Sequence, residues 1–185
     1  MKGISPQSLL DTYQAERHPV GATVLQNTMA QTALVTPDDR HDALLSAMAE
    51  LLALDEPRQR VAGMISGLDI AYELGEGHPL LGRRMPDLDL QADSGPTRVF
   101  ALLRGARPVL LNLAGGGFDI APWADRVTWV DAECAGGWEL PVLGMVPAPP
   151  GVLIRPDGHV AWVGDLTDPS LPRALTKWFG EPNPA

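Results

Sequence analysis

The sequence of 185 residues contains one cysteine and two lysines, and these shortages restrict what it can do. A single cysteine, Cys134, excludes a disulfide bond within the chain and fits a reducing compartment. The lysines are Lys2 and Lys177, and the net charge is −9. Nucleic acids and anionic membranes require clustered lysine and arginine side chains. We therefore expect no nucleic acid and no membrane among its partners.

Long apolar runs are also missing. No stretch approaches the roughly 18 apolar residues of a membrane-spanning helix, and the amino terminus lacks the basic start and apolar centre of a signal peptide. We expect a cytoplasmic protein. Hydrophobic residues make up 45% of the chain, which is typical of a globular protein with one sizeable core or two small ones.

Residues 147–165 (PAPPGVLIRPDGHVAWVGD) predict a buried hairpin. The apolar residues 152–154 and 160–163 flank a turn at 156–158, in which Gly158 is free to take a positive φ. Pro150, ahead of the first strand, is a candidate for a cis peptide bond. A closing helix is expected at 171–179. This order resembles the second half of a thioredoxin-like domain, with Pro150 at the position of that family's cis-proline.

Helix signals dominate the first third of the chain. Ser5 and Pro6 are typical of a helix start, and an apolar stripe runs from Leu9 to Met29. Pro19 should kink or break this helix near His18, because proline cannot donate to the carbonyl of Ala15.

Two further helices and one short strand are expected before the next break. Residues 36–39 (TPDD) supply a cap, a proline and an acidic first turn. The apolar face of that helix would be Leu44, Leu45, Met48, Leu51 and Leu52. Glu56-Pro57 would open a third helix that runs from Arg58 to Ser66 and ends at Gly67. The alternation in residues 68–74 predicts a short strand.

A segment rich in glycine and proline, residues 75–96, indicates a domain boundary near His78. We expect a helical segment over 1–78 and a second domain over 79–185. In the second domain, residues 108–113 and 127–131 predict strands, and residues 97–103 predict a short helix or strand. With the hairpin and closing helix, this gives about four strands in an α/β or α+β arrangement.

Several stretches carry a more specific resemblance. They are residues 9–28 (LLDTYQAERHPVGATVLQNT), 78–90 (HPLLGRRMPDLDL), 109–113 (VLLNL), 141–165 and 175–180 (LTKWFG). In this order they resemble the carboxy-terminal third of FAD-dependent aromatic polyketide hydroxylases, which belong to the para-hydroxybenzoate hydroxylase-like flavin monooxygenases. The resemblance implies the end of a flavin domain followed by an appended thioredoxin-like domain. The expected fold is therefore α/β, with an N-terminal helical segment and a thioredoxin-like domain that lacks CxxC.

The resemblance also bears on the cofactor. That family binds FAD through a glycine-rich turn after its first strand and through a later Gly-Asp motif. By the resemblance this chain starts after both, so we expect no FAD to be bound by the chain alone, although FAD is implied for the full-length family. Residues 115–117 (GGG) look superficially like a phosphate loop, but no GxGxxG or GK[ST] pattern follows them.

Candidates for chemistry are few. Thioredoxin-type cysteines would fall at 117–120, which hold none, and we interpret Cys134 as a passive small residue rather than a nucleophile. The histidines are too scattered for a metal motif: His18, His41, His78 and His159. We therefore assign no catalytic, cofactor-binding or metal-binding residue.

Three remaining patterns have two interpretations each. Glu16-Arg17-His18 predicts ion pairs or a ligand site. Asp87 and Asp89 predict solvated acids or a catalytic carboxylate pair. Trp129 and Trp162 predict sheet-face packing, with a flat pocket for a polycyclic ligand as the alternative.

Three functional classes follow for a monooxygenase-related protein of aromatic polyketide biosynthesis. It is the carboxy-terminal piece of a split hydroxylase, a non-redox accessory or dimerisation module, or a stand-alone aromatic polyketide-binding protein or cofactor-free enzyme such as a cyclase. An amphipathic helix over 9–29 would leave apolar surface uncovered without a partner. We therefore expect a homodimer or a complex with a flavin-binding monooxygenase component.

Overall fold

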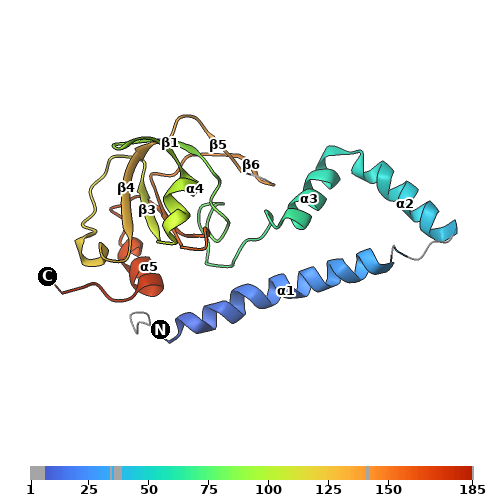
Figure 1. Cartoon of the computed structure of the whole chain (residues 1–185), viewed down its shortest axis with the longest axis horizontal. Coiled ribbons are helices and arrows are strands. Elements are labelled where there is room, and N and C mark those ends of the chain that lie inside the picture. The colour runs from blue at the N-terminus through green and yellow to red at the C-terminus, as the bar shows by residue number, and fades with distance from the viewer. Residues whose placement is uncertain (1–6, 34, 36–38, 141, 185) are drawn as a thin grey trace. The chain divides into compact units, whose positions relative to one another are not determined.

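A computed structural model describes residues 7–33, 35, 39–140 and 142–184 (Figure 1). The chain divides into a helical unit, Leu10–Ile70, and a C-terminal unit that contains Ala71–Ala185. Ala71 already belongs to the C-terminal unit, because it forms a β-bridge with Arg83 and because the neighbouring Tyr72 N–H donates to the Gly82 carbonyl at 3.0 Å. This bridge is the only β-structure at 68–74, so the predicted strand there is wrong.

The described residues of the helical unit form the helices α1, which starts one residue earlier (Leu9–Ala33), α2 (Asp39–Leu52) and α3 (Asp55–Ser66). Helix α1 runs through Pro19 as one continuous helix (Figure 1). Of the two predicted outcomes, a kink or a break near His18, the break is therefore wrong. A proline removes one backbone hydrogen bond, and the other bonds of this 25-residue helix continue on both sides of it. The proposed start signals Ser5 and Pro6 and the TPD of the second helix lie outside the described residues.

Helix α3 confirms the expected signals at both ends. Asp55 and Glu56 stand in its first turn, where carboxylates interact favourably with the positive end of the helix dipole. Gly67 follows the last turn with a φ of 71°, and its N–H donates to the Gly63 carbonyl. Glycine reaches this left-handed conformation without steric cost.

The C-terminal unit is built on a six-stranded mixed sheet with the order β2-β1-β4-β3-β7-β8. Its strands are β1 (Asp89–Ala92), β2 (Gly95–Arg98), β3 (Val109–Asn112), β4 (Thr128–Glu133), β7 (Gly151–Ile154) and β8 (Val160–Gly164). Only β3 and β4 pair in parallel; every other pairing in this sheet is antiparallel. The strands β5 (Trp138–Leu140) and β6 (Gly144–Val146) form a separate hairpin.

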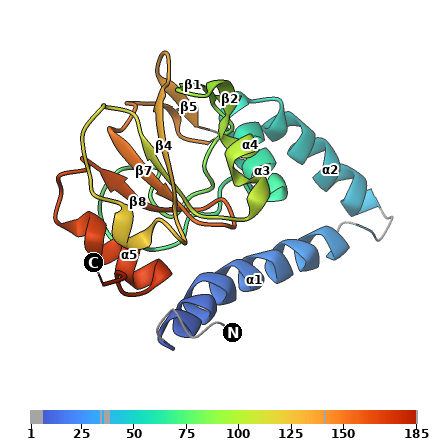
Figure 2. The same cartoon turned by 60° about the vertical axis from the view of Figure 1, so that its left-hand side comes forward.

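Short helices complete this unit. Helix α4 (Val99–Leu102) and the 3-10 turn η1 (Leu103–Gly105) follow β2 directly, so residues 97–103 are part strand and part helix. A second 3-10 turn, η2 (Ala121–Trp123), precedes β4. Helix α5 (Ser170–Phe179) closes the chain as expected and lies against β8 (Figure 2). None of the helices in the described part of the chain is long and apolar enough to cross a membrane.

The sheet has a hydrophobic core on each face. Along β3, Val109 and Leu111 belong to one cluster and Leu110 to the other, because successive strand residues point to opposite faces. The first cluster includes Met85 and Trp138. The second includes Trp162, α5 residues and the partly buried Trp129, as expected for sheet-face packing.

The peptide bond before Pro150, the candidate for a cis bond, is trans. The Pro150 carbonyl accepts a 2.8 Å hydrogen bond from the Leu113 N–H, one step beyond the β3–β7 ladder. The chain is therefore already paired with β3 when it enters β7. Its peptide bond takes the trans form, which is favoured at most X-Pro bonds. The turn that follows β7 is as predicted, with Gly158 at a φ of 83°.

Replacing Leu110 by alanine should lower the free energy of unfolding of the C-terminal unit by about 2–5 kcal/mol, because Leu110 is fully buried and its loss leaves a cavity. All five tryptophans lie in this unit, so their fluorescence in a urea titration reports its unfolding selectively. Leu25→Ala is the control, since Leu25 is 67% exposed. Equal destabilisation by both variants would contradict this account of the core.

Candidate functional site

The carboxyl ends of β3 and β4 form the edge at which a thioredoxin-type centre would lie. Asn112 and Asp131 are register partners at these ends. In α/β sheets, ligands bind outside the carboxyl ends of parallel strands. A pocket of about 550 Å³ lies here, lined by Gln91, Ala92, Asp93, Asn112, Leu113, Ala114, Gly115, Asp131, Ala132 and Glu133.

Hydrogen bonds within the protein hold the polar groups of this edge. The buried Asn112 Nδ2 donates to Asp131 Oδ1 at 2.7 Å and to the Gly116 carbonyl at 2.9 Å. Trp129 Nε1 donates to Asp131 Oδ2 at 2.5 Å. Asn112 therefore ties the glycine loop to β4, and both oxygens of Asp131 already accept a hydrogen bond. Sequence reasoning missed this pair, although a polar residue that ends the apolar run VLLN was a usable signal.

No pair of thiols stands at this edge. Residues 117–120 follow β3 without a cysteine. Cys134 comes directly after β4, where it is partly buried and packs against the core cluster of Met85 and Trp138. The edge therefore offers no dithiol for disulfide exchange.

The glycine loop does not fit the pyrophosphate of FAD. Such a site needs a helix amino terminus directly behind the loop, so that free N–H groups face the phosphates. Behind Gly115–Gly117 the chain runs without regular structure to η2, a single 3-10 turn, and then enters β4. Of the two features that hold a dinucleotide, this edge has the glycines but not the helix amino terminus behind them.

The two acids that suggested a carboxylate pair are held by one arginine. Arg98 Nε lies 3.0 Å from Asp87 Oδ2 and 3.5 Å from Asp89 Oδ1. Asp87 Oδ1 also accepts a 2.9 Å hydrogen bond from the Phe100 N–H. These carboxylates therefore connect β1, β2 and α4. Their role is structural, and they do not form a catalytic pair.

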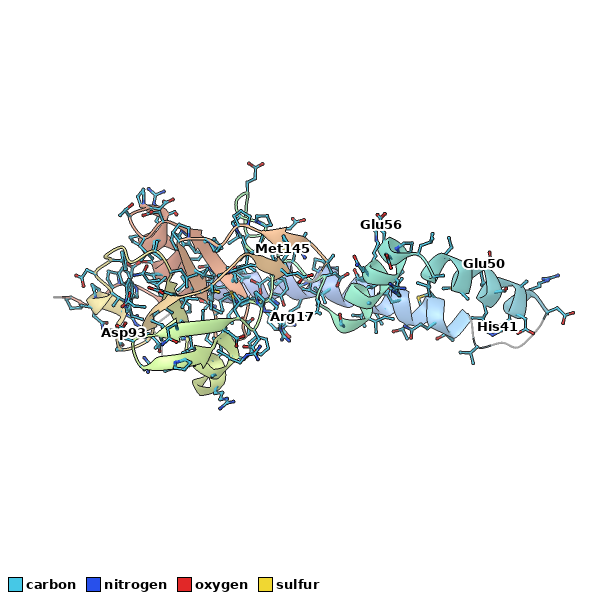
Figure 3. The ribbon with its side chains drawn as sticks, turned by 90° about the horizontal axis from the view of Figure 1, so that it is seen from above. Arg17, His41, Glu50, Glu56, Asp93 and Met145 are labelled. Atoms are coloured by element: carbon cyan, nitrogen blue, oxygen red, sulfur yellow. The ribbon has the colours of Figure 1, made fainter. Side chains whose placement is uncertain are left out.

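The histidines are not brought together. His18 lies exposed on α1, and His41 lies near the start of α2 (Figure 3). In the C-terminal unit, His78 Nδ1 accepts from the Leu80 N–H at 3.2 Å, while Nε2 lies 3.1 Å from the Pro147 carbonyl. No group of three or more metal-ligating side chains occurs among the residues that the structure describes. The Glu16-Arg17-His18 triplet is divided, with Glu16 buried and the other two exposed.

A cluster of charged and aromatic side chains lies around the β7–β8 turn, and sequence reasoning missed it. The Arg155 guanidinium lies 4.4 Å from the Trp178 ring centre and 5.5 Å from that of Tyr72. Its Nη2 lies 2.5 Å from Asp157 Oδ2. His159 stacks on Tyr72 with 4.5 Å between ring centres. Cation–π contacts of this kind strengthen as they lose water, and the Arg155 side chain is only 11% exposed.

Asp157 is the anion of this cluster. Burial alone would raise the pKa of its carboxyl, but contacts with His159 and Arg155 outweigh burial and hold the pKa well below the usual range. The His159 backbone N–H donates at 3.2 Å, whereas the ring Nδ1 is 3.5 Å away, which is long for a hydrogen bond. We therefore regard Arg155 as the stronger side-chain partner. Asp157 stays ionised and fixes Arg155 between the two rings.

The Asp157→Asn substitution should lower the free energy of unfolding by about 1–2 kcal/mol at neutral pH, a value that allows for partial solvent screening. A carboxyl with a lowered folded pKa contributes its full stabilisation above the unfolded value of about 3.9. That contribution is lost as the pH falls through the lower folded pKa. The difference between the two proteins should therefore shrink below about pH 4.

Urea titrations between neutral and acidic pH, followed by tryptophan fluorescence, measure this difference. Asp93→Asn is the control, since Asp93 is exposed and makes no ion pair with a described residue. A destabilisation that stays constant with pH would show that the charge of Asp157 is not what stabilises the turn.

Comparison with known proteins gives one consistent relationship. The family described as "Aromatic-ring hydroxylase, C-terminal" matches residues 78–182. The 12-dehydrotetracycline 5-monooxygenase/anhydrotetracycline 6-monooxygenase of Streptomyces rimosus is 41% identical over 185 residues. That match covers 97% of this chain but 36% of the relative, so the chain spans about a third of the curated relatives' length.

Solved structures show the same relationship. BexE, studied for oxidation during BE-7585A biosynthesis, is 42% identical, with a TM-score of 0.85 over 100% of this chain and 37% of that one. PyrE3, a Diels-Alderase in the biosynthetic pathway of pyrroindomycins, is 35% identical, with a TM-score of 0.73 over 97% of this chain and 34% of that one.

Proposed function

Because the chain belongs to the aromatic-ring hydroxylase C-terminal domain family, we propose that it is the non-redox carboxy-terminal module of a flavin-dependent monooxygenase. In this proposal it acts in aromatic polyketide biosynthesis, together with a flavin-binding portion that supplies the chemistry. The match to about a third of each relative supports this division. The edge of β3 and β4 supports it too, because it lacks both a dithiol and a dinucleotide-binding helix.

The observation that carries the proposal is the exposed apolar surface of the helical unit. On α1, Tyr13, Leu25 and Met29 are each about two-thirds exposed or more. Helix α2 buries none of its residues, and its predicted apolar positions Leu44, Leu45 and Leu51 are exposed. Surface of this kind marks an interaction site. We propose that the flavin-binding portion covers it, whether on the same or a separate polypeptide.

A second candidate function is favoured by the likeness to PyrE3. A module of the same fold occurs in a tetracycline-pathway monooxygenase and in a Diels-Alderase, so it accompanies more than one reaction type. This likeness favours a non-catalytic role for the module. It also supports the alternative that the complete protein is a cyclase, in which the same helical surface would serve a partner portion that performs no oxidation.

Titration of the 185-residue chain with FAD tests whether this chain binds the flavin by itself. We expect no saturable quenching of flavin fluorescence at micromolar concentrations, because the glycine loop at 115–117 leads only to the 3-10 turn η2 and not into a helix that could hold the pyrophosphate. A cooperative thermal transition of the same sample is the control for folding. Saturable, stoichiometric binding would show that this chain makes its own flavin site.

The docking surface is tested by mixing the chain with the flavin-binding portion of the Streptomyces rimosus monooxygenase from which its own carboxy-terminal module has been removed. Sedimentation should show a complex that the double substitution Leu25→Asp and Met29→Asp weakens at least tenfold, because both side chains are exposed on α1. Gln26→Asp adds a charge on the same helix and is the matched control. Equal binding by all three proteins would contradict the proposed surface.

A further inference from the structure

We propose that a second pocket of the C-terminal unit binds a small aromatic carboxylate. It has a volume of about 280 Å³ and lies between the β7–β8 turn and α4. Its lining residues are Arg84, Phe100, Leu103, Arg104, Pro156, Asp157 and Gly158. The site is separate from the edge of β3 and β4 and from the apolar surface of the helical unit, so it does not depend on the proposed function.

The wall that carries Arg84 is held by backbone hydrogen bonds. Arg84 forms a β-bridge with His159, the Met85 N–H donates to the Gly158 carbonyl at 2.8 Å, and the Val160 N–H donates to the Arg83 carbonyl at 2.9 Å. Met85 is fully buried. Because side chains alternate along extended backbone, Arg84 faces away from the core.

The opposite wall is fixed in a similar way. Val99 is fully buried at the start of α4, and the Phe100 N–H is held by Asp87. This leaves the Phe100 ring 48% exposed at the pocket. Leu103, from η1, and Gly158, from the turn, both line the pocket. The hydrogen bonds of Phe100 N–H to Asp87 and of Met85 N–H to Gly158 therefore hold the two walls in place.

The two arginine side chains in the lining, Arg84 and Arg104, favour an anionic ligand. The side chains of Arg84 and Arg104 make no hydrogen bond or ion pair with any residue that the structure describes. Asp157, the only acid in the lining, is already paired with Arg155. Two guanidinium groups thus remain available, in a chain whose net charge is −9. Guanidinium groups bind carboxylates through paired, charge-assisted hydrogen bonds.

The remaining lining sets the size and character of the ligand. Phe100, Leu103 and Pro156 supply an apolar surface next to the two cations. A half-exposed aromatic ring favours a flat ligand, which it can stack against. Ligand pockets usually measure roughly 300–1,000 Å³. At about 280 Å³ this pocket lies just below that range, so it suits one or two rings rather than a tetracyclic polyketide.

Calorimetric titration of the full 185-residue chain with 2-naphthoate tests the site. The neutral isostere 2-naphthamide and inorganic phosphate are the comparison ligands, and the Gly158 amide signal in NMR locates the binding. We expect saturable binding of naphthoate that Arg84→Gln and Arg104→Gln each weaken about tenfold or more, since each removes a charge-assisted contact. Arg173→Gln, at an exposed position on α5, is the matched control and should bind like the unchanged protein.

Four results would overturn the proposal. They are no saturable binding of naphthoate, binding of naphthamide as tight as that of naphthoate, binding of phosphate as tight as that of naphthoate, and equal weakening by Arg173→Gln. Thermal unfolding of each variant shows that it is folded. Because no measurement involves flavin or a second protein, failure here is distinguishable from failure of the proposed function.

Discussion

The burial of β3 on both faces is the constraint on which the C-terminal unit depends. Val109, Leu110 and Leu111 are fully buried, and they divide between two cores. The strand pairs with β4 on one side and β7 on the other. Its last residue, Asn112, then organises the edge where a thioredoxin would keep its cysteines, by binding Asp131 and the glycine loop. This edge therefore has a structural role, and residues 117–120 beside it contain no cysteine.

Sequence patterns predicted the elements whose signals are local. The hairpin of β7 and β8 and helix α3 follow from turn chemistry and caps at Gly158 and Gly67, which the structure confirms. The hairpin of β1 and β2 was missed, because its strands have only four residues each and lie in a segment rich in glycine and proline. The Pro150 carbonyl accepts from the Leu113 N–H, which is distant in sequence, and the local sequence carries no signal for this pairing.

The candidate sites were less predictable than the fold for the same reason. Arg155 and Asp157 are close in sequence, but Tyr72 and Trp178, whose rings enclose the guanidinium, come from opposite ends of the unit. Arg84 and Phe100 likewise meet only through the pairing of residues 83–85 with the β7–β8 turn. A single sequence carries no signal for such contacts. Family resemblance identified the module, and only the structure shows which of its side chains are available.

We propose that the helical surface of this module packs against a flavin-binding portion. Amide hydrogen exchange tests it most directly, with and without the flavin-binding portion of the Streptomyces rimosus relative. The account predicts slower exchange in α1 and α2 on mixing, and unchanged exchange in β3, which the protein's own cores already protect. Unchanged exchange throughout α1 and α2 in a mixture that forms a complex would contradict it.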